Sequence, residues 1–321
     1  MWTKVAPWVW LPVVACLVWT VVRVPGWERG WPWVQVMAFT PYVAAGSVAV
    51  AVLALVARRW VAGAVAVVAA VSLCAVVVPR ASRDRHSTAD GQPLRVLTVN
   101  LMGGRADGRA LASLVDRLDV DVLALQELTP DGDAALRDAG VYRLLPFAAA
   151  FPLPGVSGSA VLSRYPLTSP SHRRLRGGSV QARATVEVPG AVPVDVESAH
   201  PAAPWGAPGM ANWYHDLRAQ PPATVDGRPR VLLGDFNATL DHAALRRLVD
   251  TGYRDAAAVA GTGLRTSWPS RWPSNGRRLT LPVTLDRVLA DRRIGIAAAR
   301  PYRIAGTDHR SVYAALVVPV R

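Results

Sequence analysis

The chain has 321 residues, 51% of them hydrophobic, and a formal net charge of +13. This length allows one or two domains. Both cysteines, Cys16 and Cys74, lie in the apolar first quarter of the chain, which excludes a disulfide or a zinc-thiolate site from the remainder. The basic balance fits phosphate-bearing partners such as anionic lipid headgroups or nucleic acid, and an arginine-biased composition explains it equally well.

Three stretches before position 80 carry no formal charge: 5–22, 31–57 and 60–78. Each is long enough to cross a hydrocarbon core, which takes about 20 apolar residues as a helix. We therefore expect a membrane anchor over 1–79 with three transmembrane helices at about 5–22, 34–57 and 60–78. A cleaved signal peptide is the alternative for the first of them.

The loops of this anchor predict its orientation in the membrane. Trp27, Trp31 and Trp33 crowd the loop after the first helix, and tryptophan prefers the membrane interface. Arginines in short loops favour the cytoplasm, which places the turn at Arg58 and Arg59 there. With three spans, the rest of the chain then lies outside. We therefore expect a multi-pass protein of the cell membrane whose C-terminal domain is extracytoplasmic.

A polar stretch at 80–93 reads as a linker, and a single domain is expected over 94–321. Short apolar runs alternate there with helical patterns, which indicates an α/β fold with sheets covered by helices. Strands are expected near 94–99, 120–126, 159–163, 180–188, 192–198, 230–234, 284–290 and 311–318. Helices are expected near 107–118, 208–219 and 241–250.

Nearly every predicted strand has a polar residue at one tip. These residues are Asn100, Glu127, His200, Asp235, Asn237, Asp286, Asp308 and His309. In "VLLGDFN", Asp235 and Asn237 stand either side of Phe236. Because side chains alternate along an extended chain, both polar groups are expected to point one way while Phe236 enters the core.

A set of Glu, Asp, Asn and His without a cysteine or a serine elbow suits phosphoester hydrolysis. Magnesium is typically held by one or two carboxylates and by the phosphate oxygens of its substrate. Such a metal stabilises developing charge while a carboxylate orients the attacking water. An imidazole paired with a carboxylate adds a positive donor. The set therefore predicts a hydrolase that uses Mg²⁺ or Mn²⁺.

The same motifs resemble those of the endonuclease/exonuclease/phosphatase superfamily, whose fold is that of deoxyribonuclease I. They occur in the order of that family from about residue 94 to 318: "TVNL", "LALQE", "GSAVLSRYPL", "LLGDFN", "TLDRVL" and "GTDHRSV". The resemblance implies a four-layer α/β/β/α sandwich, two sheets face to face with helices outside, and a divalent-metal site at one rim.

The resemblance also implies the residues that hold the metal. Glu127 matches the principal metal ligand, Asn100 the asparagine beside it, and Asp308 a further metal-binding or hydrogen-bonding carboxylate. Some nuclease members carry an acidic residue two positions after the asparagine. This chain has Met102 there, which weakens the nuclease interpretation.

The catalytic roles follow from the same resemblance. Asp235 matches the residue that positions or deprotonates water, and Asn237 matches one that contacts the phosphate. His200 matches a histidine that steadies the pentavalent phosphorus. Asp286 and His309 match the carboxylate and imidazole partners.

Three further features leave alternatives open. Arg164 in "LSRYP" is a candidate phosphate contact or an ordinary edge-strand arginine. The loop 264–278 interleaves two tryptophans with four arginines, which suits stacking on bases, a lipid interface or a purely structural role. Other histidines, such as His242, lack a comparable context and are expected to be surface or structural residues.

Joined to its three-span anchor, the domain resembles membrane members of the VanJ type, which are associated with teicoplanin resistance. This resemblance implies hydrolysis of a lipid-linked phosphate or pyrophosphate, such as a polyprenyl carrier, next to the bilayer. A metal-dependent endo- or exonuclease, a phosphodiesterase of the sphingomyelinase or phospholipase C kind, and a non-enzymatic sensor are the alternatives. No protein partner is inferred.

Overall fold

The computed structural model describes residues 7–84, 90–223, 225–270 and 281–321. From residue 92 onward the chain forms two six-stranded mixed sheets. The first has the strand order β11-β12-β1-β2-β4-β3, and the second β5-β6-β7-β8-β10-β9. Their bounds are β1 (Gln92–Asn100), β2 (Val122–Gln126), β3 (Phe147–Phe151), β4 (Ser159–Ser163), β5 (Leu167–Arg174), β6 (Val180–Val186), β7 (Val194–Ala199), β8 (Arg230–Asp235), β9 (Tyr253–Asp255), β10 (Asp286–Asp291), β11 (Gly295–Arg303) and β12 (Arg310–Val318).

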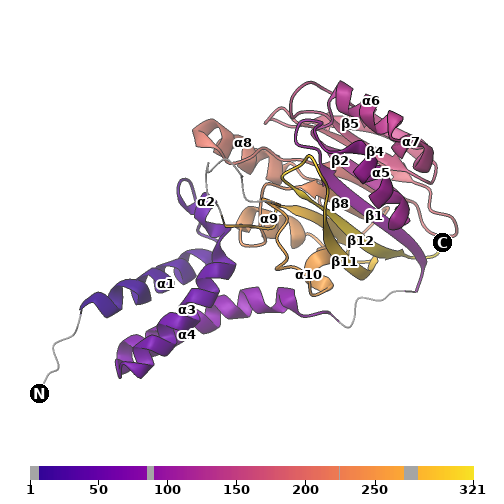
Figure 1. Ribbon diagram of the computed structural model, residues 1–321. Coiled ribbons are helices and arrows are strands. Elements are labelled where there is room, and N and C mark those ends of the chain that lie inside the picture. Colours follow the sequence, from indigo (N-terminus) through magenta and orange to yellow (C-terminus); the bar gives the residue numbers. More distant parts are fainter. Residues whose placement is uncertain (1–6, 85–89, 224, 271–280) are drawn as a thin grey trace, which may run out of the picture.

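Helices cover the outer faces of both sheets, so that the domain has four layers (Figure 1). The first sheet carries α5 (Gly108–Arg117), α6 (Pro130–Asp138) and α7 (Val141–Leu144). The second carries α8 (Gly206–Arg218) and α9 (Ala243–Val249), and a short α10 (Ala256–Val259) follows β9. This is the α/β sandwich that the sequence predicts. We call residues 92–321 the sandwich.

The alternation of side chains along the strands divides the core into layers. In β1, Leu94 and Val96 face the second sheet, while Leu97 and Val99 face helices α5 to α7. Strand β8 follows the same rule, with Val231 inward. Burial on both faces explains why these central strands read as nearly continuous apolar runs.

Before the sandwich lie η1 (Pro7–Val9), α1 (Trp10–Arg23), α2 (Trp33–Met37), α3 (Thr40–Val56), α4 (Trp60–Val77) and η2 (Val78–Ala81). We call residues 7–84 the N-terminal helices. Helices α1, α3 and α4 pack together and project away from the sandwich (Figure 1).

One of these helices, Trp60–Ala81, is long and apolar enough to cross a membrane. Trp10–Arg23 and Thr40–Val56 are apolar but shorter. The helix expected over 34–57 is divided into α2 and α3, because Pro41 lies in the first turn of α3, where proline favours a helix start. Residues 5 and 6 of the first expected span lie outside the described residues.

The first residues of the predicted linker contact the sandwich. Arg80 is buried in η2, and the backbone of Arg83 forms a bridge to Ala260. Residues 85–89 are outside the described part of the chain. The division into anchor, linker and domain stays a prediction.

Within residues 94–321, the eight predicted strands and three predicted helices are all found, with ends shifted by a few residues. The strands that the sequence pattern misses are β3, β5, β9 and β11, which are the four edge strands of the two sheets. Edge strands are short, polar or alanine-rich here, as in "FAAAF" and "LTSPSHRR", and this composition gives little apolar signal. Helices α6, α7 and α10 are also missed.

Candidate active site

The predicted polar residues continue the inward-facing rows of their strands. In β1 the row that begins with Leu94 and Val96 ends at Asn100, and in β8 the row with Leu233 ends at Asp235. Asp286 pairs directly with Asp235 across β10 and β8. Each strand is apolar between the sheets and polar at the same rim, so the rim receives a group of side chains on rigid supports.

Asn100 connects the two sheets at this rim. Its amide Nδ2 donates to Glu127 Oε1 and to Asp235 Oδ2, both at 3.1 Å. Its Oδ1 accepts the backbone N–H of Met102 at 2.9 Å. Asn100 is 1% exposed, so it holds the two carboxylates in a fixed relation away from bulk water.

Glu127 and Asn237 both have a left-handed backbone, with φ of +58° and +48°. This conformation is costly for a side chain larger than asparagine and is concentrated at functional sites. Gly103 N–H donates to Glu127 Oε2 at 2.7 Å, and the preceding residue, Met102, also has positive φ. The turn at 102–103 thus fixes the site through its backbone, at the place where some nucleases have an acidic side chain.

Asp235 is 2% exposed and accepts the backbone N–H of Asn237 at 2.8 Å. Phe236 is fully buried, as expected. Asn237 departs from the expected extended conformation: its left-handed backbone turns its side chain to Pro201, whose carbonyl accepts from Nδ2 at 3.0 Å. Asn237 O in turn accepts from the Trp213 indole at 2.9 Å.

Gly234 explains part of the "LLGDFN" motif. A Cβ at this position would lie 1.9 Å from the carbonyl oxygen of Ala199 in the neighbouring strand. Only glycine allows β7 and β8 to approach so closely just before Asp235.

His309 and Asp286 form a buried pair. The imidazole Nδ1 lies 2.9 Å from Asp286 Oδ2, and Nε2 lies 3.8 Å from Asp235 Oδ2. Burial by itself lowers the pKa of His309, but the carboxylates of Asp286 and Asp235 outweigh it and raise this pKa to about 10. The imidazole is therefore positively charged at neutral pH, which fits the positive donor expected from an imidazole paired with a carboxylate.

His200 lies on the Glu127 side of the rim. Its Nε2 is 3.8 Å from Glu127 Oε1, and its buried Nδ1 has no hydrogen-bond partner among the described residues. A buried ring nitrogen without a partner is costly in a protein that binds nothing there. Nε2, the nitrogen that faces Glu127, is the one that a group bound at this rim would meet.

The indole of Trp268 holds Asp308 at the edge of the site, and the sequence pattern does not predict this contact. Asp308 Oδ2 accepts from the Trp268 indole at 3.0 Å, and Asp308 Oδ1 lies 3.9 Å from His309 Nε2. Ser267 Oγ accepts the backbone N–H groups of Leu285 and Asp286. Ser267 and Trp268 belong to the "TSWP" part of the loop 264–278. Residues 271–278 of this loop lie outside the described residues.

The structure does not bring Arg164 to the site, so its predicted phosphate contact is wrong. Residue 164 follows Ser163, which pairs with Val122 at the start of β2, whereas Glu127 follows the end of that strand. The guanidinium of Arg164 is instead paired with Asp119 at 2.5 Å and lies 3.5 Å from Asp121. It belongs to the opposite end of the sandwich.

The donor set fits a hard divalent cation. One ligand atom each from Asp235, Asp286 and His309 lie within 4.8 Å of one another. The oxygens of Glu127 adjoin this group through Asn100, and carboxylate and amide oxygens are the ligands of Mg²⁺ and Mn²⁺. Because a protonated His309 has no lone pair to offer a metal ion, the oxygens of Glu127, Asn100 and Asp308 stay the predicted metal ligands.

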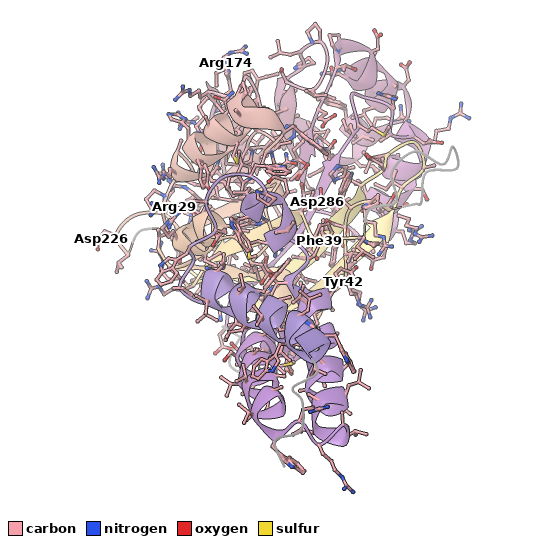
Figure 2. All side chains as sticks on the ribbon, turned by 90° about the vertical axis from the view of Figure 1, so that its left-hand side faces the viewer. Arg29, Phe39, Tyr42, Arg174, Asp226 and Asp286 are labelled. Carbon is pink, nitrogen blue, oxygen red and sulfur yellow. The ribbon has the colours of Figure 1, made fainter. Side chains whose placement is uncertain are left out.

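A cavity of about 190 Å³ lies elsewhere, between the N-terminal helices and the sandwich. Tyr42 at the start of α3 and Thr284 near Asp286 are among its lining residues, and Tyr42 donates to the carbonyl of Pro282 at 2.7 Å. In the view of Figure 2, the labelled side chains of Phe39 and Tyr42 project below Asp286. The helical segment therefore contacts the residues that precede Asp286 in the chain.

Comparison with known proteins agrees with this geometry. The model of the Endonuclease/Exonuclease/phosphatase family matches residues 97–309. No curated protein matches the chain.

Solved structures share the fold at low identity. An endonuclease/exonuclease/phosphatase from Beutenbergia cavernae is 20% identical, with a TM-score of 0.56 over 71% of this chain and 72% of that one. TDP2 from C. elegans is 16% identical, with a TM-score of 0.57 over 72% and 77%. A humanized D. rerio TDP2 is 16% identical, with a TM-score of 0.56 over 70% and 98%.

Proposed function

Because the chain belongs to the endonuclease/exonuclease/phosphatase family, whose members hydrolyse phosphoester bonds, we propose that it is a membrane-anchored, divalent-metal-dependent phosphoesterase acting on lipid-linked phosphate or pyrophosphate esters. The observation that supports the chemistry is the Asn100 bridge. It joins Glu127 to Asp235 and lies beside the His309 and Asp286 pair.

The residues divide the work of hydrolysis. Asp235, held by Asn100 and by the Asn237 N–H, orients a water molecule and accepts its proton. His309 carries positive charge opposite it and stabilises the oxygens of the phosphoryl group. His200 and the second N–H of the Asn237 amide supply further donors. A Mg²⁺ ion at Glu127, Asn100 and Asp308 would neutralise phosphate charge.

The membrane assignment rests on the N-terminal helices. Helix Trp60–Ala81 is long enough to span a bilayer, and α1 and α3 pack against it with exposed apolar faces. Trp27 and Trp31 are 63% and 77% exposed beside the sandwich, as interfacial residues are. A site tethered next to the membrane surface meets lipid headgroups at high effective concentration, which favours a lipid-linked substrate. The domain would then face outward, and a role in teicoplanin resistance follows the VanJ resemblance.

A substrate panel tests this proposal on the full chain in lipid vesicles. The panel contains undecaprenyl pyrophosphate, sphingomyelin and single-stranded DNA, since a D. rerio TDP2 is known with a single strand DNA product. We expect Mg²⁺-dependent phosphate release from the prenyl pyrophosphate, abolished by EDTA and by Asp235→Ala.

The other outcomes separate the alternatives. Metal-dependent cleavage of DNA with no phosphate release from the lipid would identify a nuclease. Release of choline phosphate would identify a phosphodiesterase. No turnover of any substrate, together with no binding of Mg²⁺ or Mn²⁺, would leave a non-enzymatic protein. Protease accessibility on intact cells tests the sidedness separately.

A further inference from the structure

The strongest link between the N-terminal helices and the sandwich is a buried carboxylate. Asp241 is 1% exposed and lies in the segment after β8. Arg23, the last residue of α1, donates to its Oδ1 at 2.9 Å, and Arg80 of η2 donates to both oxygens at 2.7 and 2.8 Å. The ends of α1 and η2, which are far apart in sequence, are thus both hydrogen-bonded to the side chain of Asp241.

This buried charge is held in its ionised form. Burial by itself raises the pKa of Asp241, but the hydrogen bonds and charges of Arg80 and Arg23 outweigh it and keep this pKa below its ordinary value. Arg23 also donates to the carbonyl of Leu240 at 3.1 Å. The backbone next to Asp241 is therefore fixed together with the side chain.

Helix α2 holds the same segment through His242. The imidazole Nδ1 of His242 accepts the N–H of Thr239 at 2.9 Å, and its Nε2 lies 2.6 Å from the carbonyl of Val34. Burial lowers the pKa of His242, so that the ring is neutral and donates through Nε2. Glu28 accepts the N–H of Ala243, and Val34 packs in the core between α8, α9 and their sheet.

The segment that these contacts hold, residues 239–243, is continuous with the site. Asp235 and Asn237 precede Thr239 by four and two residues, and Thr239 accepts the backbone N–H of Asp241 at 3.2 Å. Trp213 joins both parts, because its indole donates to Asn237 O while its ring packs edge-on against His242 at 5.3 Å. Contacts and chain therefore connect Asp241 to Asp235 and Asn237 without a break.

We propose that the N-terminal helices are a working part of the active site: through Asp241 and His242 they hold the 235–242 segment in the geometry that Asp235 and Asn237 require. Asp241 is a positioning residue and contacts no substrate. Asparagine adopts a left-handed backbone readily, and the contacts of Asp241 and His242, which we call the clamp, hold the turn around Asn237 in place.

The test replaces the clamp by apolar residues of similar volume. Such a replacement of a buried ion cluster often preserves stability and removes only the directed bonds. The variant is Arg23→Met/Arg80→Met/Asp241→Leu. Its control makes the matched change at the far end of the sandwich, where Asp121 is bonded by Arg95 and lies near Arg164: Arg95→Met/Arg164→Met/Asp121→Leu.

Two measurements are made on the full chain in vesicles. Hydrogen exchange of peptides covering 235–243 is expected to be about tenfold faster in the clamp variant and unchanged in the control. With bis(4-nitrophenyl) phosphate and Mg²⁺, kcat is expected to fall at least about tenfold while KM stays within about twofold, because positioning rather than binding is lost.

Exchange in 235–243 that matches the unmodified protein, or a control that lowers kcat as much, would overturn the proposal. Exchange decides the matter even if the probe is not hydrolysed. If the clamp variant does not fold, Arg23→Lys serves instead. It keeps the charge but not both bonds of Arg23, to Asp241 and to Leu240, and we expect about threefold changes in the same directions.

Discussion

Carboxylates at the two ends of the sandwich are bonded by different partners. At the far end, Asp121 is fully buried and takes two hydrogen bonds from Arg95, with Arg164 3.5 Å away. At the other end, the carboxylates of Glu127, Asp235 and Asp286 are bonded by an asparagine, by backbone N–H groups and by histidine. Among the ion pairs of the described residues, none joins these three to an arginine.

This difference separates a structural from a functional use of the same residue type. Arginine neutralises a carboxylate permanently and occupies its oxygens in fixed geometry. Carboxylates that gather without arginine keep net negative charge and remain able to bind a metal ion. The chain has 36 basic residues, so the lack of arginine partners in this cluster is informative.

The largest expected effect that separates the ends is on catalysis. Asp235→Ala removes the group that orients and deprotonates water, and we expect kcat/KM to fall about 10³-fold. Asp121→Asn, at the far end, is expected to stay within about twofold of the unmodified enzyme. Both are measured with the substrate that the panel identifies. Equal losses in the two variants would erase the functional distinction.

For stability we expect the opposite: substitution of Asp121 should cost more than substitution of Asp235. Asp121→Asn leaves two arginines without their buried partner and is expected to lower the free energy of unfolding by about 2 kcal/mol. Asp235→Asn keeps only one of the two hydrogen bonds that Asp235 accepts, from Asn100 and from the Asn237 N–H, but it relieves repulsion with Asp286 and Glu127. We therefore expect it to lower the free energy of unfolding by about 1 kcal/mol. Urea unfolding of both variants without added metal measures the difference. A larger loss for Asp235→Asn would contradict the comparison.

The smallest expected effect concerns acid. Because the pKa of Asp241 is lowered in the folded protein, its bonds to Arg23 and Arg80 contribute stability above the unfolded pKa of about 3.9. This contribution is lost as the pH falls through the lower, folded value. The free energy of unfolding, measured with urea, should therefore fall more steeply with acid in the unmodified chain than in Arg23→Met/Arg80→Met/Asp241→Leu. The difference should appear as the pH falls through the folded-state pKa of Asp241. Parallel pH profiles would show that Asp241 is not held ionised.

The inner strands of the fold and the strand-tip residues of the site could be predicted from sequence because each such strand is apolar until its last residue. Edge strands such as β5 carry no such contrast and were missed. Arg164 was misplaced because its motif lies next to a strand whose other end points to the site. The Trp268 contact and the Asp241 clamp join residues 40 to 218 positions apart, and no local pattern encodes such a pairing.

Metal binding tests the central claim most directly, because it depends on the rim and on no particular substrate. Mn²⁺ titrated into the full chain, followed by electron paramagnetic resonance, should bind the unmodified protein and Asp121→Asn alike. Glu127→Gln should weaken the affinity at least about tenfold, since a carboxylate ligand is lost. Equal Mn²⁺ affinity in Glu127→Gln and the unmodified chain, or no binding to either, would contradict a metal-dependent site at this end of the sandwich.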